Sequence, residues 1–406
     1  MNQKLRIISV LAICFFLSLT IHPSTVNALA NSDYIRDSPL TRDYWPTDGW
    51  LNSTPDEQGM DSTILQEMVD YVDDENYNIY SVVVIRNGYI AFENYFKSYI
   101  NANSTHLMYS VTKSFTSALI GICIDQGYIA NTSQTLLSFF PEYNITNVDE
   151  RRERITIEHL LTMRSGMAWD ETSAPYNTPA NDIFHINTGD GVEHSLNLDM
   201  EAEPGEYWHY NTGASHLLAA IVQQVTGMTT LEFAIENLFD PLGIDPVYWS
   251  RDTAGWYKGG FDLRMSTRNS AKFGYLFLNN GTWDGDQLIS EEWVNASTTT
   301  ITQFNDYEGY SKQWWTIPEL RIYFAAGLYG QYIYVAPEHD LVVAFNSRVD
   351  EYYPHRDLLF NYILPSINEA SEALLVNDVL IISLVIIVLV PTIVAGVYWL
   401  QIKRGQ

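Results

Sequence analysis

The order of sequence patterns in this 406-residue chain predicts an α/β fold, of the α+β type, built on an antiparallel sheet flanked by helices. The first strand signal is a hairpin, and a long, mainly helical stretch follows it. Three or four strand-length runs then precede a last helix. Strands from both ends of the domain must then share one sheet, with the helical stretch inserted between them. The domain is expected over residues 56–370 and the helical insertion over about residues 135–260.

The predicted hairpin follows a helix. Residues 60–72 repeat apolar side chains with the period of a helix. Two runs rich in β-branched and aromatic residues, 81–86 and 89–96, are then separated by Asn87-Gly88. Asn-Gly favours the two-residue turn that joins antiparallel strands, because both of its central positions take positive φ. These residues therefore predict the first two strands.

The remaining helices and strands are predicted from apolar side chains that recur with the period of a helix and from short aromatic runs of strand length. An apolar helix is expected over residues 110–126, where Gly127 closes it. Helical patterns recur through the insertion and after it, and the short aromatic runs with turns between them have strand length. The expected helices are 157–162, 215–225, 231–239, 267–278 and 355–369, and the expected strands are 312–317, 322–326, 331–335 and 341–345.

The N-terminus carries a targeting signal. A positively charged start precedes the apolar run 7–21, and small residues at 28–30 offer a cleavage site. This pattern is typical of a secretory signal peptide, here residues 1–30. Residues 31–55 are polar and rich in Pro, Asp and Trp, as expected of a lead-in segment before the domain.

The C-terminus carries a membrane signal. Residues 379–400 contain no charged side chain and would span about 33 Å as a helix, enough for the core of a bilayer. Lys403 and Arg404 should remain on the cytoplasmic side, within the tail 401–406. We therefore expect a single-pass protein of the cell membrane, held by its C-terminal helix, with the main domain outside the cell.

Composition excludes several classes of function. The net charge of −27 argues against nucleic acid as a partner, because phosphate binding requires a basic face. No His-x-x-x-His pair is present, so no metal site is predicted, and no cofactor is expected. No Gly-x-Ser-x-Gly motif occurs, which argues against an α/β-hydrolase fold.

Ser110-Val111-Thr112-Lys113 is the strongest chemical signal. A serine hydroxyl is a poor nucleophile until another group takes its proton. Residues three apart share one face of a helix, so the Lys113 amine can approach the Ser110 oxygen. If burial lowers the pKa of that amine, it can act as a base near neutral pH. This pair predicts covalent catalysis through Ser110.

Five segments around this pair resemble, in the same order, the motifs of the serine β-lactamase and D-alanyl-D-alanine peptidase superfamily. The resemblance is to its class C-like branch, which includes esterases and 6-aminohexanoate-oligomer hydrolases. It covers roughly residues 55–365, and five ordered segments are far more specific than any one of them. The segments are 109–115 (YSVTKSF, then Gly127-Tyr128), 160–167 (LLTMRSGM), 204–213 (PGEYWHYNTG), 240–244 (DPLGI) and 326–331 (AGLYGQ).

The resemblance implies a mechanism for this chain. Ser110 would attack a carbonyl carbon and form an acyl-enzyme, while Lys113 would accept its proton. Tyr210 matches the motif tyrosine that passes a proton to the leaving group and helps to activate the deacylating water. The oxyanion hole would consist of the backbone N–H groups of Ser110 and Leu328.

The sequence departs from the family pattern at two of its substrate-binding positions. The usual Tyr-x-Asn reads Tyr210-Asn211-Thr212, so a hydroxyl replaces the amide unless Asn211 takes over its role. The Lys/His-Thr-Gly motif is absent, and Ala325-Ala326-Gly327 stands in its place. That cation normally binds the carboxylate of a penicillin or of a D-alanyl-D-alanine terminus. The expected substrate contacts are therefore Asn211, Thr212, Ala326 and Gly327, without a cation among them.

Three functions fit these residues. The favoured one is a serine hydrolase that cleaves a small-molecule or peptide-like ester or amide lacking a required carboxylate. The second is a β-lactamase or a peptidase of cell-wall peptides. The third is a non-catalytic ligand-binding protein that has kept the fold, which the joint presence of Ser110, Lys113 and Tyr210 disfavours.

Overall fold

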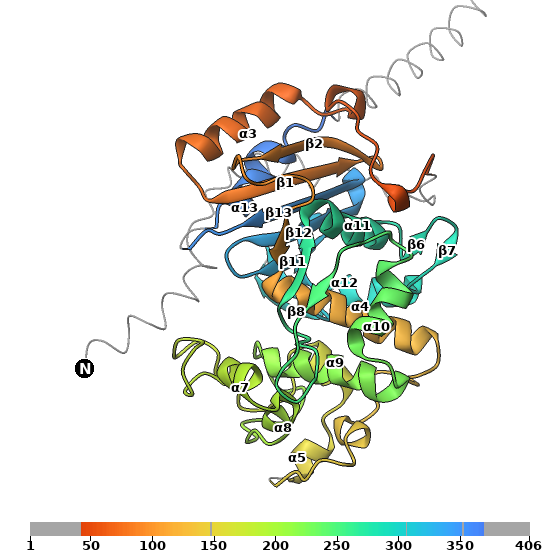
Figure 1. Ribbon diagram of the computed structural model, residues 1–406, viewed down its shortest axis with the longest axis vertical. Coiled ribbons are helices and arrows are strands. Elements are labelled where there is room, and N and C mark those ends of the chain that lie inside the picture. The colour runs from red at the N-terminus through yellow and green to blue at the C-terminus, as the bar shows by residue number, and fades with distance from the viewer. Residues whose placement is uncertain (1–41, 147, 306, 351–352, 369–406) are drawn as a thin grey trace, which may run out of the picture.

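An eight-stranded antiparallel sheet forms the upper half of the molecule in Figure 1. The computed structural model describes residues 42–146, 148–305, 307–350 and 353–368. The strand order is β2-β1-β13-β12-β11-β10-β9-β8, so the first hairpin lies beside the last strand of the chain. The prediction of one sheet assembled from both ends of the domain is confirmed. Its strands are β1 (Ile79–Arg86), β2 (Tyr89–Tyr95), β8 (Thr302–Asn305), β9 (Glu308–Tyr310), β10 (Trp315–Ile317), β11 (Ile322–Gly327), β12 (Gln331–Ala336) and β13 (Leu341–Ser347).

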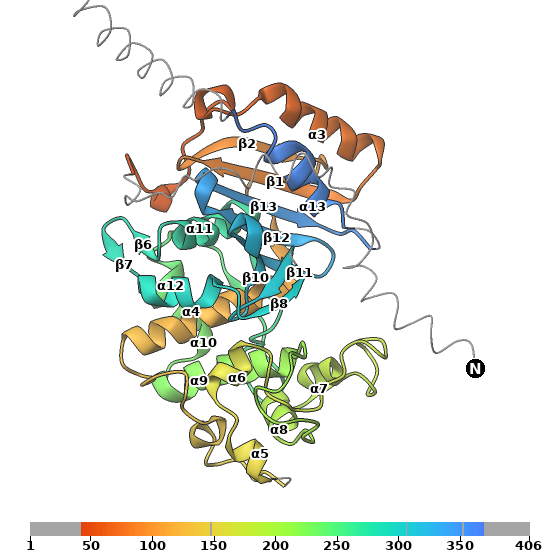
Figure 2. The same ribbon diagram turned by 180° about the vertical axis from the view of Figure 1, so that it is seen from behind.

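Both faces of this sheet are covered, which explains why β1 is apolar at successive positions. Val82 and Val84 pack with α3 and α13 on one face, whereas Val83 and Ile85 pack with α4 and α11 on the other. Figures 1 and 2 show these helix pairs on opposite sides of the sheet. Alternate residues of a strand point to opposite faces, so each face receives its own apolar set.

Helices and two small sheets make up the rest of the regular structure among the described residues. The helices are α3 (Ser62–Asp74), α4 (Thr112–Asp125), α5 (Glu150–Glu153), α6 (Ile157–Leu161), α7 (Asp182–Thr188), α8 (Gly191–Leu196), α9 (Thr212–Thr226), α10 (Thr230–Ala234), α11 (Thr267–Leu278), α12 (Glu291–Thr298) and α13 (His355–Leu358). Two π-helical turns, Ile235–Phe239 and Leu359–Ile363, extend α10 and α13. Two small sheets contain β3 (Thr105–Leu107), β5 (Leu263–Ser266) and β4 (Tyr248–Trp249), and β6 (Thr282–Trp283) and β7 (Asp286–Gln287).

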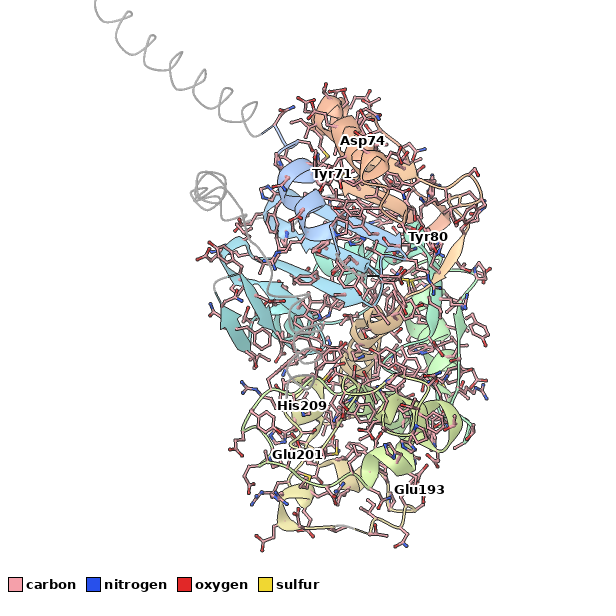
Figure 3. The ribbon with its side chains drawn as sticks, turned by 90° about the vertical axis from the view of Figure 1, so that its left-hand side faces the viewer. Tyr71, Asp74, Tyr80, Glu193, Glu201 and His209 are labelled. Atoms are coloured by element: carbon pink, nitrogen blue, oxygen red, sulfur yellow. The ribbon has the colours of Figure 1, made fainter. Side chains whose placement is uncertain are left out.

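The helical insertion lies below the sheet, and α4 lies between the two halves (Figure 1). Helices α5 to α10 belong to this insertion, and α9 packs directly against α4. All residues of α4 from Thr112 to Cys123 are buried, because the helix meets the sheet on one side and the insertion on the other. In Figure 3 the labelled Tyr71, Asp74 and Tyr80 mark the sheet half, and Glu193, Glu201 and His209 mark the insertion.

Several predicted boundaries were wrong for identifiable reasons. The helix predicted from residue 110 begins at Thr112, because residues 109–111 form a 3₁₀ turn in which Tyr109 has a φ of 46°. The helix predicted over 60–72 is displaced by two residues, since the side chain of Asp61 caps it. The strand predicted over 312–317 shortens to β10, and β8 and β9 were missed because they are short and partly polar.

No single helix among the described residues is long and apolar enough to cross a membrane. Helix α9 and the α10 segment reach the required length and composition only together, and they are bent by 82°. The predicted signal peptide, the transmembrane segment 379–400 and the tail 401–406 lie outside the described residues. They stay predictions.

Candidate active site

Ser110 lies in the turn that leads into α4, at the junction of the sheet and the insertion. It is half-buried, with its backbone against the end of β11. A Cβ at Gly327 would fall 2.4 Å from the Met108 carbonyl oxygen and 3.3 Å from the Ser110 amide nitrogen. Only glycine allows this approach, and Leu328 follows it directly. The backbone amides predicted for the oxyanion hole therefore belong to two segments in close contact.

Lys113 is the base candidate, and its amine lies beside the Ser110 hydroxyl. Lys113 Nζ is 3.1 Å from Ser110 Oγ and donates to the Gly260 carbonyl oxygen at 3.0 Å. The side chain is buried, with 2% of its residue surface exposed. Burial lowers the pKa of Lys113 to about 8, because the charged ammonium loses its hydration. A substantial fraction of this amine is neutral near physiological pH, as a general base requires.

Tyr210 is the third predicted catalytic residue, and its ring lies under the Lys113 ammonium. Lys113 Nζ lies 4.8 Å from the centroid of the Tyr210 ring. Burial raises the pKa of Tyr210 well above its ordinary value, and a hydrogen bond with the Ser110 hydroxyl opposes this only in part. The phenol therefore keeps its proton at neutral pH. It is suited to donate and relay a proton, whereas Lys113 is the group that can accept one.

The Asn211 side chain is held at the start of α9. Its side-chain Oδ1 accepts from the Ala214 amide at 2.9 Å and so caps α9. Its Nδ2 is buried without a hydrogen-bond partner among the described residues. Thr212 is buried as the first residue of α9, and its backbone amide faces a carboxylate. The Asn211 oxygen is therefore occupied as a helix cap, and substrate contact by Asn211 and Thr212 stays a prediction.

The carboxylate beside Thr212 belongs to Glu171, a residue that the sequence analysis missed. Its Oε2 accepts from the Thr212 amide at 3.0 Å and from the Trp169 indole. Its negative charge raises the pKa of Lys113 and so opposes part of the effect of burial. Glu171 follows the LLTMRSGM segment by four residues, but a single glutamate in a loop carries no recognisable pattern.

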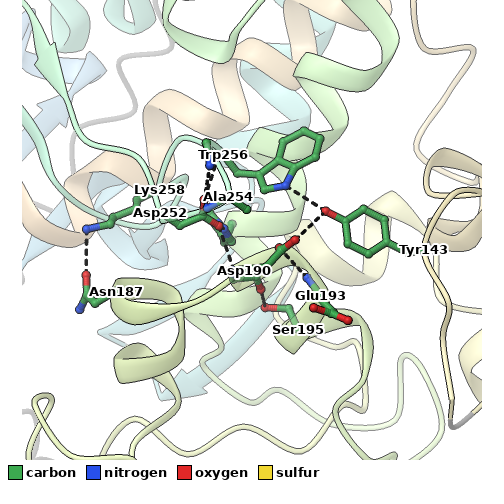
Figure 4. Close-up of polar contacts among 12 residues, drawn as sticks. Tyr143, Asn187, Asp190, Glu193, Ser195, Asp252, Ala254, Trp256 and Lys258 are labelled. Atoms are coloured by element: carbon green, nitrogen blue, oxygen red, sulfur yellow. Dashed lines mark hydrogen bonds and ion pairs between the residues drawn. The ribbon is translucent and has the colours of Figure 1, made fainter.

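The loop that delivers the Gly260 carbonyl was also missed. Asp252 organises this loop: its Oδ1 accepts from the amides of Ala254, Gly255 and Trp256, at 2.8–3.0 Å (Figure 4). Its Oδ2 accepts from the Gly191 amide and lies 3.2 Å from Nε2 of the buried His216. At the far end of the loop, Gly260 has no room for a side chain.

Two neighbours of Gly260 leave no space for a side chain at this position. A Cβ at this position would lie 2.5 Å from Thr212 Cγ2 and 3.3 Å from Lys113 Nζ. The preceding carbonyl, of Gly259, accepts from the hydroxyl of Thr116 in α4 at 2.6 Å. Two successive carbonyl groups of the insertion thus face α4, and one of them orients the Lys113 amine.

An aromatic cluster borders Tyr210 on the side of the sheet edge. The Trp208 ring is central, with ring centroids 4.8 Å from Phe304, 5.5 Å from Tyr310 and 5.9 Å from Trp315. Trp315 also stacks on Tyr210 at 6.2 Å. Phe304 is 37% exposed, so the cluster reaches the surface. It forms an apolar wall beside Tyr210.

The end of β11 carries no cation among its motif positions. Ala325 is buried, with 1% of its surface exposed, and belongs to the core on the α4 face. Ala326 is half-buried on the opposite face, and Gly327 ends the strand. This stretch therefore offers backbone groups and a small apolar surface to a bound molecule.

Comparisons with known proteins agree with this geometry. The profile of the family described as Beta-lactamase matches residues 66–364. The chain belongs to the Beta-lactamase family. A curated relative, the 6-aminohexanoate-dimer hydrolase of Paenarthrobacter ureafaciens, is 24% identical over 318 residues, covering 72% of this chain and 78% of the relative. The lovastatin esterase of Penicillium rubens is 29% identical over 154 residues, 33% of this chain and 37% of that protein.

Solved structures show the same fold for this Beta-lactamase family member. A putative 6-aminohexanoate-dimer hydrolase from Bacillus anthracis superposes with a TM-score of 0.64 at 22% identity, covering 75% of this chain and 82% of that chain. EstCE1, a hydrolase with promiscuous acyltransferase activity, superposes with a TM-score of 0.60 at 14% identity, covering 76% and 98%. The chain is thus a member of the serine β-lactamase-fold hydrolases, and the sequence resemblance is confirmed at the level of family and fold.

Proposed function

We propose that this protein is a serine hydrolase that cleaves an ester or amide through an acyl-enzyme on Ser110. The observation that carries the proposal is the 3.1 Å contact between Lys113 Nζ and Ser110 Oγ, made by a buried amine with a pKa of about 8. An ordinary surface lysine would be fully protonated and could not take the serine proton. The loss of hydration inside the fold makes this lysine a usable base.

The reaction then proceeds in two halves. The Ser110 oxygen attacks the substrate carbonyl carbon as its proton passes to Lys113, and the carbonyl oxygen gains negative charge. The amides of Ser110 and Leu328 stabilise that charge by hydrogen bonding. Tyr210 donates a proton to the departing alcohol or amine, leaving the acyl group on Ser110. Water then attacks the acyl carbon and gives up a proton to the Tyr210 phenolate. Lys113 returns its proton to the Ser110 oxygen as the acyl bond breaks and the acid leaves.

The substrate class follows from the charges and the apolar surface of the site. A carboxylate entering beside Ala325 and Ala326 would lose its hydration without gaining a charge-assisted bond there, which costs several kcal/mol, on the order of an unpaired buried charge. The negative charge of Glu171 also acts on Lys113, so it would disfavour a second anion in the site. The aromatic wall of Trp208, Phe304 and Trp315 suits an apolar group. We therefore infer a neutral substrate with an apolar acyl or leaving group.

Two relatives, a 6-aminohexanoate-dimer hydrolase and a lovastatin esterase, support the cleavage of an amide or an ester. We also propose that the enzyme works outside the cell, held by the apolar segment 379–400. The described domain ends at Asn368, shortly before that segment. Truncation after about Asn377 should release an active, soluble domain, and a truncated protein that still fractionates with membranes would contradict the anchor.

A β-lactamase or D-alanyl-D-alanine peptidase remains the second candidate, because two arginines lie near Ser110. Burial raises the pKa of Tyr109, the residue next to Ser110, and the charges of Arg348 and Arg264 oppose part of this rise. The Arg348 guanidinium lies 5.2 Å from the centroid of the Tyr329 ring. Arg268 is not available for this role, because it pairs with Glu93. Efficient hydrolysis of nitrocefin that falls on Arg348→Ala would favour this candidate.

A fluorophosphonate probe tests the proposed function directly. The extracellular domain should become labelled at Ser110, as located by mass spectrometry, and Ser110→Ala should abolish the label. The matched control is Ser138→Ala, which removes an exposed serine hydroxyl far from Lys113 and should leave labelling unchanged. A folded wild-type protein that takes no label, or a Ser110→Ala protein that keeps it, would refute the proposal and favour a ligand-binding protein.

A further inference from the structure

We propose that Asp182, His185 and His194 form a binding site for a zinc-class divalent metal ion in the helical insertion. One ligand atom of each residue lies within 4.8 Å of the others. Asp182 and His185 belong to α7, and His194 belongs to α8. The two short helices bring together residues that have no metal-binding spacing in the sequence.

The tautomer of His185 supports a ligand role. Its Nε2 lies 3.1 Å from the Pro179 carbonyl oxygen, which can only accept, so Nε2 carries the hydrogen. The neutral ring then has its lone pair on Nδ1. Metal-bound histidines typically have this arrangement, in which one ring nitrogen donates to a carbonyl and the other binds the metal.

An ion pair alone explains only part of the cluster. His194 Nε2 lies 2.8 Å from Asp182 Oδ1, which a protonated histidine would satisfy. The neutral His185 stacks on His194 with ring centroids 4.2 Å apart, and the ion pair makes no use of its Nδ1 lone pair. A bound cation would use this lone pair and compensate the Asp182 carboxylate.

The donor set indicates the class of metal. Two imidazoles and one carboxylate suit Zn²⁺ better than Ca²⁺ or Mg²⁺, which prefer oxygen ligands. The ligand atoms of a tetrahedral zinc site lie about 3.3 Å apart, because each bond to the metal is about 2.0 Å long. Side-chain rotations that move each ligand atom by about 1 Å would bring the three atoms to this separation. A strongly negative protein also raises the local concentration of cations.

A hollow beside the cluster supplies access and a further ligand. It has a volume of about 480 Å³ and is lined by His185, His194, Asp190 and Glu193, among others. Asp190 is already occupied, because it accepts from the Tyr143 hydroxyl and the Glu193 amide (Figure 4). The Glu193 carboxylate is exposed at the hollow, so it or a water molecule is suited to the fourth position.

The cluster is connected to the segment that carries Glu171. Asp182 Oδ2 accepts from the Asp170 amide at 2.6 Å, and the Trp169 ring contacts the edge of His194 at 6.4 Å. The Trp169 indole in turn donates to Glu171. A bound ion would therefore hold α7, α8 and residues 169–171 together. This role is structural and does not depend on the proposed catalysis.

Zinc binding by the untagged protein, freed of metal with a chelator, tests the site. Isothermal titration should show one Zn²⁺ per chain, and Co²⁺ should give the visible absorption of a low-coordinate N/O site. The melting temperature should rise by several degrees with Zn²⁺ in excess of its dissociation constant, because the ion binds only the folded chain. His185→Ala and His194→Ala should each weaken binding by about tenfold or more, because the loss of an outer-shell partner alone typically costs about tenfold.

His339→Ala is the matched control, because His339 lies in the turn before β13, outside the cluster, and it should bind Zn²⁺ like the wild type. If a histidine variant unfolds, Asp182→Asn offers a milder change that should also weaken binding. A wild-type protein without stoichiometric zinc would overturn the proposal. Binding that survives in the His185→Ala/His194→Ala double variant would also overturn it, since the ion would then sit elsewhere.

Discussion

The sheet half and the helical insertion contribute different kinds of groups to the same site. The sheet half supplies Ser110 and Lys113 from the start of α4 and the Gly327–Leu328 backbone from β11. The insertion supplies Tyr210, Glu171 and the Gly260 carbonyl, all from loops or helix starts. Ser110 and Lys113 thus come from the sheet half, while the groups that orient the Lys113 amine and tune its pKa come from the insertion. The proposed catalysis requires the two halves to be docked.

The largest effect should come from removing one partner on each side of this boundary. Lys113→Ala removes the base of the sheet half, and Tyr210→Phe removes the phenol of the insertion. Each should lower kcat by about 10³-fold or more, and the double variant should lose little beyond the worse single one, because the groups act as a unit. Steady-state kinetics on an ester substrate checks this. Multiplicative losses in the double variant would show that the halves act independently.

A glycine of the sheet half provides the second test. In Gly327→Ala the new Cβ would meet the Met108 carbonyl at 2.4 Å, so β11 must move away from the Ser110 turn. Misplacing an oxyanion-hole donor typically costs about 10²-fold in kcat. Ala326→Gly, one residue earlier, is the control for general loosening of the strand. Full activity of Gly327→Ala would mean that this contact does not position the Leu328 amide.

Glu171 allows the influence of the insertion to be measured as a pH shift. The activity kcat/KM should rise with pH through about 8, as Lys113 loses its proton. The Glu171 charge raises the pKa of Lys113, so Glu171→Gln should move this rise to lower pH. Glu319→Gln, an exposed charge at the far end of β10, should leave the profile in place. An unchanged profile in Glu171→Gln would assign Glu171 a purely structural role.

The smallest effect is expected at Ala325. A lysine there should narrow the difference in kcat/KM between p-nitrophenyl esters and nitrocefin, but only severalfold, because Ala325 is buried in the core. The new amine must lose its hydration before it can meet a carboxylate. Ala325→Met, of similar length without charge, separates charge from bulk. Equal gains in both variants would rule out carboxylate recognition.

The two halves also differ in how far the sequence predicted them. The hairpin at Asn87-Gly88, helix α11 and strands β11 to β13 were predicted within a residue or two, since each has a strong local period or turn signal. Ser110, Lys113 and Tyr210 were found because they occur in ordered motifs, and the structure brings them together. Glu171 and Gly260 were not found. Their roles depend on loops folding back against α4, and loop position is set by long-range contacts such as those of Asp252.

The bond from Lys113 to Gly260 has a consequence for how the protein fails. It joins residues 147 positions apart and crosses the boundary between the halves. The amine keeps its lowered pKa only while the insertion shields it from water. A partial opening of the insertion, far short of global unfolding, would hydrate the Lys113 ammonium. Lys113 would then stay protonated and could not accept the Ser110 proton. Activity therefore reports the docking of the insertion. Denaturant should abolish the activity at concentrations at which the sheet is still folded.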